Sequence, residues 1–541
     1  MTDPATELRA AIEAAAASLR GEPGEEPAEV GLERPPKPEF GDYSTNAAML
    51  LAPAMGEQPR AVAERLSERL AAELGDQLDR VEVAGPGFLN LFLADAWYRG
   101  AASALAAAEE LGGSDRGAGE RVLVEFVSAN PTGPLTAASG RHAAYGDSVA
   151  RVLEVTGHAV GREYYVNDTG GQIERFAQSI AARMRGESPP EGGYEGEYVT
   201  ELAERLVGEG VGPDDVEALA GRGTELMREH AEQTLRRYGV EFDSWFFEHS
   251  LDDSGARDRV LAELREAGNV YESEGAIWLR TTSFGDDKDR VLVRSDGGPT
   301  YFLTDIAYHS DKLDRADRLV DVLGADHHGY VGRLKAGIEA LGLDPDRLEI
   351  EIIQLVHVVE GGERAQMSKR KGEFVTLDEL IDDIGADATR FFMLQRSHDT
   401  TVDLDLELAR KQSNDNPVYY VQYAHARIAS ILRKAGDELV AAAADAPPAA
   451  EPLVPTERAL IRRLLEFRSE VGDVAERRAP HRLCAYAMAT AADFHGFYRD
   501  CQVVGAEGDG VEAERIRLCL LAKRTIAQTL GLLGIAAPER M

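Results

Sequence analysis

The chain has 541 residues, of which 44% are hydrophobic and 7% aromatic, so several domains with buried cores are expected and a disordered chain is excluded. Its 95 acidic and 59 basic side chains give a formal charge of −36, which excludes a generally basic nucleic-acid coat. The charge is uneven, with −12 in residues 1–120, −24 in 121–420 and zero in 421–541. The C-terminal segment would therefore repel a polyanion least, although composition drift explains the difference equally well.

The amino-terminal part of the chain predicts a small α+β domain over residues 1–111. Apolar residues at helical spacing favour helices over 5–19 and 59–74, and the alternating segment 81–93 favours two strands around a Gly-Pro-Gly turn. The Gly-rich stretch 112–120 is typical of a linker.

The middle of the chain predicts a multidomain α/β fold with a Rossmann-type parallel sheet over residues 112–400. A strand at 121–128, a helix at about 139–157 and a strand at 162–168 form a βαβ unit. A second α/β half follows an insertion at about 172–290. The strands of this second half are expected at 317–324 and 348–359.

The last part of the chain predicts an all-α bundle over residues 401–541. Amphipathic helices are expected at 418–436, 457–475, 480–499 and 511–533. The three cysteines of the chain fit neither a disulfide framework nor a zinc-ligand spacing, so we expect reduced thiols in a cytoplasmic protein. No apolar stretch approaches 18 residues, so neither a signal peptide nor a membrane span is expected.

The loop after the first strand of the parallel sheet is a candidate anion site. It begins at Asn130 and leads into a helix whose first N–H groups would face a ligand beyond the strand ends. Thr136, Ser139, Arg141 and His142 could add donors for phosphate oxygens. A loop with Pro and Gly is also a common connection between a strand and a helix.

A second cationic candidate is the string QMSKRKG (366–372). It places Lys369, Arg370 and Lys371 together in a chain that has only nine lysines. Such a loop suits the charge that develops on a pyrophosphate group, whereas the alternative is a solvated surface loop.

Two further strings carry candidate ligand-binding groups. Tyr301 and Asp305 are four residues apart, and a carboxylate beside a phenol at that spacing suits a planar cation such as guanidinium, although a structural pair has the same pattern. His327 and His328 adjoin a strand end, but no third ligand has suitable spacing, so we expect no bound zinc or other metal.

Seven strings in this order resemble the arginyl-tRNA synthetases, which are class I aminoacyl-tRNA synthetases, across essentially the whole chain. The strings are VEFVSANPTGPL, AAYGD, REYYVNDTG, YFLTDIAYH, GADHHGYVGRLKAG, MSKRKGEFVTLDEL and NPVYYVQYAHARI. The resemblance implies that the segment EFGDYSTNAAMLLA (39–52) belongs to a module that binds the tRNA elbow. It also implies that the helical bundle reads the anticodon.

The implied reaction has two steps. Arginine attacks the α-phosphate of ATP, with Mg²⁺ spreading the charge, to give arginyl-adenylate and pyrophosphate; the terminal ribose of tRNA-Arg then takes the arginyl group. The resemblance assigns the following roles. Catalysis falls to Thr136, Ser139, Ser368 and Lys369; arginine binding to Glu125, Asn130, Tyr301 and Asp305; ATP binding to Asn130, Gly140, His142, His327, His328, Met367, Lys369 and Lys371; and tRNA binding to Tyr419, Tyr420, Tyr423 and Arg427. The expected enzyme is a cytoplasmic monomer.

Two departures from the family pattern bear on activity. The HIGH signature should occupy residues 136–139, where this chain has Thr, Ala, Ala and Ser, so both imidazoles are replaced. The KMSKS signature is QMSKR at 366–370, which keeps the second lysine only. Hydroxyls donate hydrogen bonds to phosphate but carry no positive charge, and His142 is a candidate to compensate.

Three functions remain open at this point. We favour a working ligase in which Thr136 and Ser139 act at the phosphates, over an inactive or repurposed paralogue that binds tRNA. The reason is that Tyr301, Asp305, Lys369 and both tRNA-binding ends are retained together. Another adenylating ligase of the same sheet class is the third option, and the long anticodon-type bundle argues against it.

Overall fold

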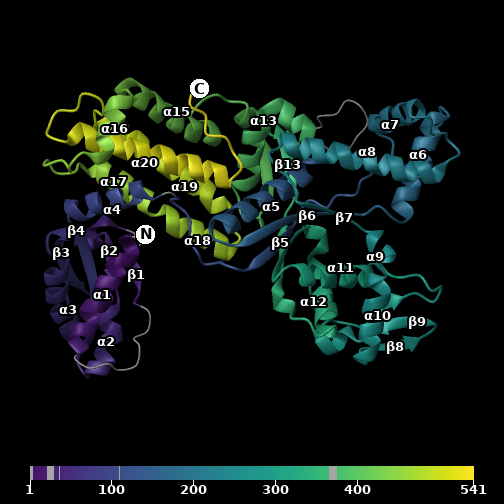
Figure 1. The fold of residues 1–541 in the computed structure, drawn as a ribbon, viewed down its shortest axis with the longest axis horizontal. Coiled ribbons are helices and arrows are strands. Elements are labelled where there is room, and N and C mark those ends of the chain that lie inside the picture. The colour runs from purple at the N-terminus through teal and green to yellow at the C-terminus, as the bar shows by residue number, and fades with distance from the viewer. Residues whose placement is uncertain (1–3, 21–29, 36, 109, 365–374) are drawn as a thin grey trace.

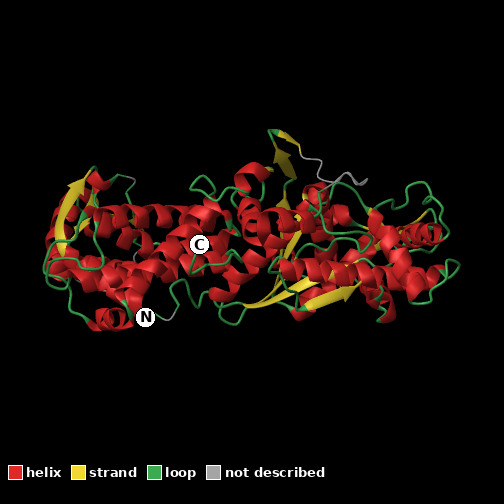
Figure 2. Cartoon of the chain, turned by 90° about the horizontal axis from the view of Figure 1, so that it is seen from above, coloured by secondary structure: helices red, strands yellow, loops and turns green. Residues whose placement is uncertain are grey.

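The computed structural model describes residues 4–20, 30–35, 37–108, 110–364 and 375–541. An amino-terminal unit and a helical bundle lie at one end of an elongated molecule, and the central parallel sheet joins them to two lobes at the other end (Figures 1 and 2). The string 366–372, with the predicted residues Met367, Ser368, Lys369 and Lys371, lies outside the described residues.

The amino-terminal unit packs helices against a four-stranded antiparallel sheet with the order β1-β2-β4-β3. Helix α3 begins at Pro59, where a missing N–H costs nothing, and buries the i, i+4, i+8 row Val62, Leu66 and Leu70. The elements are α1 (Pro4–Arg20), β1 (Leu32–Glu33), β2 (Tyr43–Thr45), α2 (Ala47–Met55), α3 (Pro59–Leu74), β3 (Leu78–Ala84), β4 (Phe88–Leu93) and α4 (Asp95–Ala107). The expected α+β character is confirmed.

The central sheet has five strands in the order β12-β11-β5-β6-β7, and every neighbouring pair is parallel. Its strands are β5 (Arg121–Glu125), β6 (Ala159–Val166), β7 (Ser244–Phe247), β11 (Arg318–Gly324) and β12 (Leu348–Ile353). Counted along the chain, the order is 5-4-1-2-3, so the direction of winding reverses between β5 and β11. Ligands of Rossmann-type sheets bind beyond the carboxyl ends of the strands at this reversal.

The expected insertion at about 172–290 needs correction, because strand β7 lies inside that range and forms the edge of the main sheet beside β6. The strand has only four residues, all half-buried, so it shows no alternation that would reveal it in the sequence. One inserted lobe therefore precedes β7 and another follows it (Figure 1). The lobes contain α6 (Gly171–Met184), α7 (Glu197–Gly208), α8 (Val216–Arg237), α9 (Ser250–Asp253), α10 (Ala256–Glu266), β8 (Val270–Ser273), β9 (Ala276–Leu279) and β10 (Arg290–Val293).

The expected strand at 348–359 is also two strands. Strand β12 ends at Ile353, and β13 (Val356–Glu360) joins a separate sheet with the order β14-β13-β15. An apolar run does not show where the chain leaves one sheet for another. The other elements of this region are α5 (Ala137–Val155), α11 (Tyr301–Arg315), α12 (Val331–Ala340), β14 (Glu363–Arg364), α13 (Leu377–Leu394), β15 (Val402–Asp405) and α14 (Leu406–Ala409).

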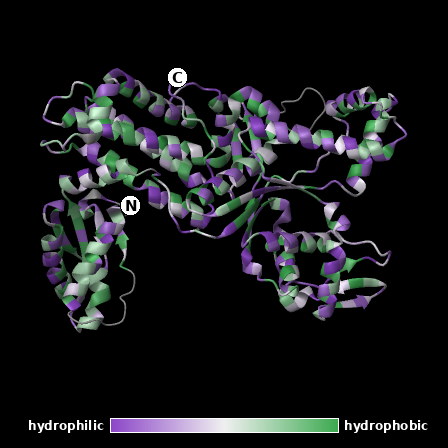
Figure 3. Cartoon of the chain, viewed as in Figure 1, coloured by the Kyte–Doolittle hydropathy of each residue, from purple (hydrophilic) through white to green (hydrophobic). Residues whose placement is uncertain are grey.

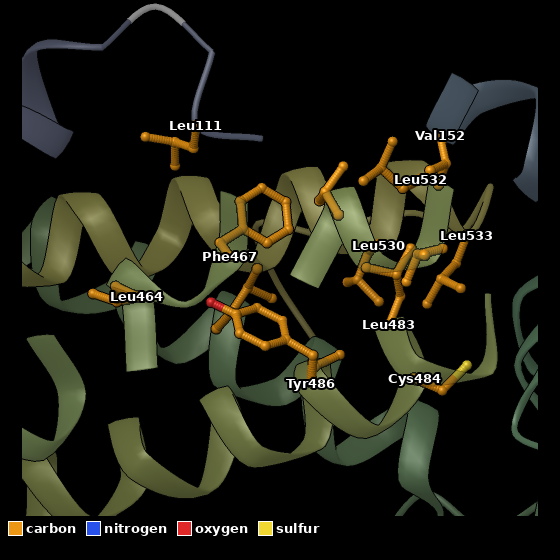
Figure 4. Close-up of a cluster of buried hydrophobic side chains, with 14 of the residues drawn as sticks. Leu111, Val152, Leu464, Phe467, Leu483, Cys484, Tyr486, Leu530, Leu532 and Leu533 are labelled. Carbon is orange, nitrogen blue, oxygen red and sulfur yellow. The ribbon is translucent and has the colours of Figure 1, made fainter. Parts of the chain in front are cut away.

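The carboxyl-terminal part is a helical bundle whose helices carry alternating hydrophobic and hydrophilic stripes (Figure 3). Its core includes Phe467 and Tyr486, whose ring centroids are 5.5 Å apart, together with Leu483 and Leu530 (Figure 4). Val152 of α5 joins the same core, so the bundle is packed on the first helix of the Rossmann-type sheet. The helices are α15 (Pro417–Ala435), α16 (Asp437–Asp445), α17 (Pro455–Leu465), α18 (Phe467–Arg477), α19 (His481–Asp500) and α20 (Val511–Leu532).

Three sequence expectations concern the bundle helix at 457–475, the cysteines and a membrane span. The helix expected at 457–475 is broken at Glu466 into α17 and α18. The three cysteines are free and buried. Over the described part of the chain, no helix is both long and apolar enough to cross a membrane.

Candidate active site and RNA-binding face

The start of helix α5 lies against the chain that follows the string 366–372. Ala137 N donates to Val375 O at 3.0 Å, and Leu377 N donates to Leu135 O at 2.8 Å. Gly140 faces Leu377 so closely that a Cβ would lie 2.7 Å from a methyl carbon of that leucine. The start of α5, which carries the first family signature, is therefore paired through its backbone to Val375 and Leu377, a contact that the sequence separation did not reveal.

The two hydroxyls expected at the phosphates have a structural partner in each other. Thr136 is the N-cap of α5, and its Oγ1 accepts from Ser139 N at 3.4 Å, while Ser139 Oγ accepts from Thr136 N at 3.4 Å. This reciprocal capping box satisfies N–H groups that a helix start leaves unpaired. Both side chains remain half-exposed, and bonds of this length are weak enough to exchange for a ligand.

Arg141, the first basic residue that follows, is buried rather than directed at a phosphate, and His142 is half-buried. Arg141 is 1% exposed and donates to the carbonyl oxygens of Gln354 and Ser397, both at 2.8 Å. Burial lowers the pKa of Arg141 to about 10. Burial, with the nearby charge of Arg141, lowers the pKa of His142 to about 4, so this imidazole is neutral at pH 7 in this structure.

A pocket lies at the start of helix α11, beyond the carboxyl edge of the sheet. Tyr301 is 69% exposed there, and Asp305 accepts a hydrogen bond from the Tyr330 hydroxyl. His327 lines the pocket, whereas His328 does not. The other lining residues are Arg290, Val291, Thr300, Phe302 and Arg333. Tyr301 and Asp305 are thus brought together at one opening.

The surroundings of Asp305 bring the pKa of its carboxyl group close to neutral pH. Burial raises its pKa to about 6, the Tyr330 hydroxyl and His309 oppose that rise, and the charges of Glu125 and Glu248 add to it. A cation in the pocket would favour the ionised form, because a positive charge beside a buried carboxylate lowers its pKa. The group therefore has the chemistry to bind a guanidinium.

Glu125 at the end of β5 does not line this pocket. It is 7% exposed, and its Oε2 accepts from Lys312 Nζ at 2.7 Å while its Oε1 accepts from Ser128 Oγ at 2.9 Å. Lys312 also donates to Asp321 Oδ1 at 2.5 Å. Sequence reasoning missed Lys312, although its rarity as one of nine lysines was a usable signal.

Glu248 is a buried acid that sequence reasoning also missed. It directly follows β7, so it lies at the same carboxyl edge of the sheet as Glu125, and it is 5% exposed. Its Oε1 accepts from Thr169 Oγ1 at 2.9 Å and from Arg257 at 3.3 Å. It was missed because strand β7 was missed.

Asn130 lies on an exposed turn with an unusual backbone. Val127 and Ser128 have φ angles of 70° and 39°, a left-handed conformation that is strained for a β-branched residue such as valine. Asn130 Nδ2 donates to Gln172 Oε1 at 2.8 Å, and Tyr165 N donates to Ser128 Oγ at 3.1 Å. The turn is therefore held by contacts to strand β6 and helix α6.

The proposed RNA-binding side chains of α15 form one aromatic face with α19. The Tyr419 and Tyr423 rings are stacked with centroids 6.0 Å apart, and Arg427 lies 4.5 Å over the Tyr423 ring. Arg427 also lies 5.1 Å over Tyr498, a residue that sequence reasoning missed. Tyr420 packs edge-on against His495. Stacked phenols with a guanidinium are suited to unpaired bases.

Metal ligands and thiols add nothing to these two sites. Within the described ranges, no group of three or more His, Cys, Asp or Glu side chains is arranged to hold a metal ion.

Family models match three parts of the chain. Residues 6–93 match "Arginyl tRNA synthetase N terminal domain", residues 225–429 match "tRNA synthetases class I (R), catalytic domain", and residues 421–541 match "DALR anticodon binding domain". The chain is 45% identical over 527 residues to an arginine–tRNA ligase of Shouchella clausii, with 94% of each chain covered. It is 43% identical over 530 residues to an arginine–tRNA ligase of Desulforamulus reducens, covering 95% of this chain and 94% of the relative.

Solved structures share the fold. A crystal structure of a protein from Campylobacter jejuni, described as a putative arginyl-tRNA synthetase, has a TM-score of 0.77 and 34% identity, covering 82% of this chain and 99% of that one. The arginyl-tRNA synthetase of Thermus thermophilus has a TM-score of 0.77 with 24% identity and covers the whole of both chains, which supports the fold alone.

Proposed function

This chain belongs to the arginyl-tRNA synthetase family, and from that premise we propose how its own residues bind arginine, ATP and tRNA. The chain attaches L-arginine to tRNA-Arg with ATP, through arginyl-adenylate, and so is an arginine–tRNA ligase. The alternative of an inactive paralogue has no support in the comparisons, because the relatives that cover 94% and 95% of the chain are ligases.

The pocket at the start of α11, with the buried carboxylate of Asp305 beside Tyr301, supports the arginine-binding proposal most strongly. Asp305 would receive the guanidinium, and Tyr301 at the exposed mouth would cover it; Glu248 would add a second negative charge nearby. A planar guanidinium donates in two parallel bonds to a carboxylate, which lysine's point charge does not. Asn130 would orient the amino-acid end, while Glu125 would act behind the pocket rather than touch the guanidinium.

For ATP, we propose that the substrate lies between the start of α5 and the end of β11. The α5 amino terminus, with Thr136, Ser139 and Gly140, would face the phosphates, and His142 and His327 would border the nucleoside. The proposed roles of Met367, Ser368, Lys369, Lys371 and the exposed His328 rest on the family pattern. Mg²⁺ would arrive with ATP as part of that substrate and spread charge on the leaving pyrophosphate.

For tRNA, we propose three units: residues 1–111 for the elbow, 112–400 for the chemistry and 401–541 for the anticodon. The stacked face of Tyr419, Tyr423 and Arg427 would receive anticodon bases, with Tyr420 behind it. The zero net charge of residues 421–541 supports this placement, because the rest of the chain is strongly acidic. A cytoplasmic monomer is the simplest form of such an enzyme.

Arginine-dependent ATP–pyrophosphate exchange, measured with and without tRNA-Arg, tests the proposal. We expect exchange in wild-type protein and a large rise in arginine KM in Asp305→Asn, with the KM for ATP nearly unchanged. Arg294→Gln is a matched control, because this exposed cation is near the pocket but does not line it. An unchanged arginine KM in Asp305→Asn would show that Asp305 does not bind arginine. The absence of exchange under any condition would show that the protein does not form arginyl-adenylate.

A further inference from the structure

Behind the proposed arginine pocket lies a buried charge cluster centred on Lys312. This side chain is completely buried on α11, two turns after Asp305, and its Nζ contacts Glu125 on β5 at 2.7 Å and Asp321 on β11 at 2.5 Å. It lies 4.8 Å from the ring centroid of Tyr308. The lysine thus joins the two strands between which the sheet reverses direction.

The lysine and the carboxylates of this cluster each stabilise the charged form of the other. Burial opposes the charge of Lys312, but Asp321 and Glu125 raise its pKa above the usual lysine value. Burial would raise the pKa of Asp321, but Lys312 and His309 lower it to about 2. His309 Nε2 is 2.7 Å from Asp321 Oδ2. Removing one member of such a set leaves an uncompensated buried charge.

The cluster is linked to the strained turn through Glu125. One oxygen of this carboxylate is held by Lys312, and the other accepts from Ser128 Oγ at 2.9 Å. Ser128 and its neighbour Val127 are the two left-handed residues of the turn that carries Asn130. A strained backbone persists only where surrounding contacts over-determine it, and the Lys312–Glu125–Ser128 chain supplies such contacts.

We infer that Lys312 is a positioning residue for arginine: through Glu125 it holds the Val127–Ser128 turn and so places Asn130 against the amino-acid end of the substrate. Because Asn130 and Asp305 are proposed arginine contacts, this role rests on the proposed function. Lys312 itself touches no substrate, since it is enclosed by α11, β5 and β11. Its loss would therefore act mainly on arginine affinity, because of the groups assigned to ATP it displaces Asn130 alone and leaves Thr136, Ser139 and Gly140 at the start of α5 in place.

A matched pair of variants separates positioning from loss of fold. Lys312→Met removes the ammonium but keeps a long apolar stem. Arg315→Met removes the next cation of the same helix, whose ion pairs are with the fully buried carboxylate of Glu163 on β6 and with Asp311. Each variant leaves a buried carboxylate without its cationic partner, so each is expected to have a lower Tm than the wild-type protein. Only Lys312→Met is expected to raise arginine KM, by about ten- to a hundredfold, with ATP KM within about twofold.

Ser128→Ala tests the same chain from its other end and deletes only one hydroxyl. We expect a rise of about three- to tenfold in arginine KM, again without a change in ATP KM. The double variant Lys312→Met/Ser128→Ala should fall short of the product of the single effects, because both act on one carboxylate. If Lys312→Met does not fold, the KM split of Ser128→Ala decides alone.

Three results would overturn the role of Lys312. These are an unchanged arginine KM in folded Lys312→Met, equal rises in arginine and ATP KM, or the same arginine effect in Arg315→Met. Asp305→Asn is run beside them to separate the two levels of inference. If it raises arginine KM while Lys312→Met and Ser128→Ala do not, the pocket stands and the positioning role fails. If Asp305→Asn has no effect on arginine KM, the proposed pocket itself fails.

Discussion

The proposed arginine pocket and the aromatic face of the bundle use similar side chains, but the partners in the two regions lie at very different distances along the chain. In the bundle, Arg427 bonds the Tyr423 hydroxyl at 2.6 Å across one helical turn. Behind the pocket, Lys312 reaches a carboxylate 187 residues away. The exposed face can lose one group without disturbing the fold, whereas each buried group in the pocket depends on several elements. Substitutions should therefore have larger and more selective effects in the pocket.

The largest expected effect is that of Asp305→Asn. Loss of one partner of a desolvated charge pair costs about 2–5 kcal/mol, so kcat/KM for arginine should fall by at least about thirtyfold. The tRNA KM should stay within about twofold, because the aromatic face is on another unit. Steady-state aminoacylation with each substrate varied in turn checks this, and a tRNA KM that rose in parallel would abolish the contrast between the regions.

The next effect concerns the start of α5, where Thr136 and Ser139 cap the helix. Replacing both by alanine should lower adenylate formation by roughly ten- to a hundredfold, if each hydroxyl donor is worth about 1 kcal/mol or more at the phosphates. Loss of the cap alone costs about 0.5–2 kcal/mol of stability. Single-turnover adenylate formation is compared with thermal unfolding: a lower Tm with unchanged adenylate formation would leave capping as the whole role of the pair.

A smaller effect is expected at the aromatic face. Arg427→Ala removes a cation stacked between Tyr423 and Tyr498, and tRNA KM should rise by about tenfold, since base stacking is worth about 1–3 kcal/mol. Arg433→Ala is the control, because this exposed arginine lies near the end of the same helix and outside the stack. Arginine KM should be unchanged in both variants. Equal tRNA KM values for the two variants would argue against a role of the aromatic face in tRNA binding.

The smallest effect is a shift in pH dependence. Asp305 must be ionised to bind guanidinium, and its pKa is raised by burial to about 6, so arginine affinity should fall as the pH drops through 6. The Tyr330 hydroxyl lowers that pKa, so Tyr330→Phe should move the acid limb of kcat/KM for arginine to higher pH. The pH profile for tRNA should not move with it. An acid limb that stays in place would show that another group controls it.

The family and the order of elements were readable from the chain because they rest on local patterns. Apolar spacing placed α3 at its observed bounds, and the spacing of Tyr301 and Asp305 placed both on one helix start. Arg427 and Tyr423 were readable for the same reason, since helical periodicity brings residues four apart together. The excess of acid and the neutral tail were likewise properties of composition alone.

Only the tertiary structure decided which groups line the proposed pocket and which lie behind it. Strand β7 has no pattern of its own and is defined by its pairing with β6, so Glu248 could not be placed from the sequence. Glu125 was expected at the guanidinium, and the sequence did not show that its two oxygens accept hydrogen bonds from Lys312 and Ser128. Thr136 and Ser139, which were expected at the phosphates, form the N-terminal capping box of α5 in the structure. Partners of a buried charge come from strands and helices far apart in the chain, because only the closed sheet brings them within reach.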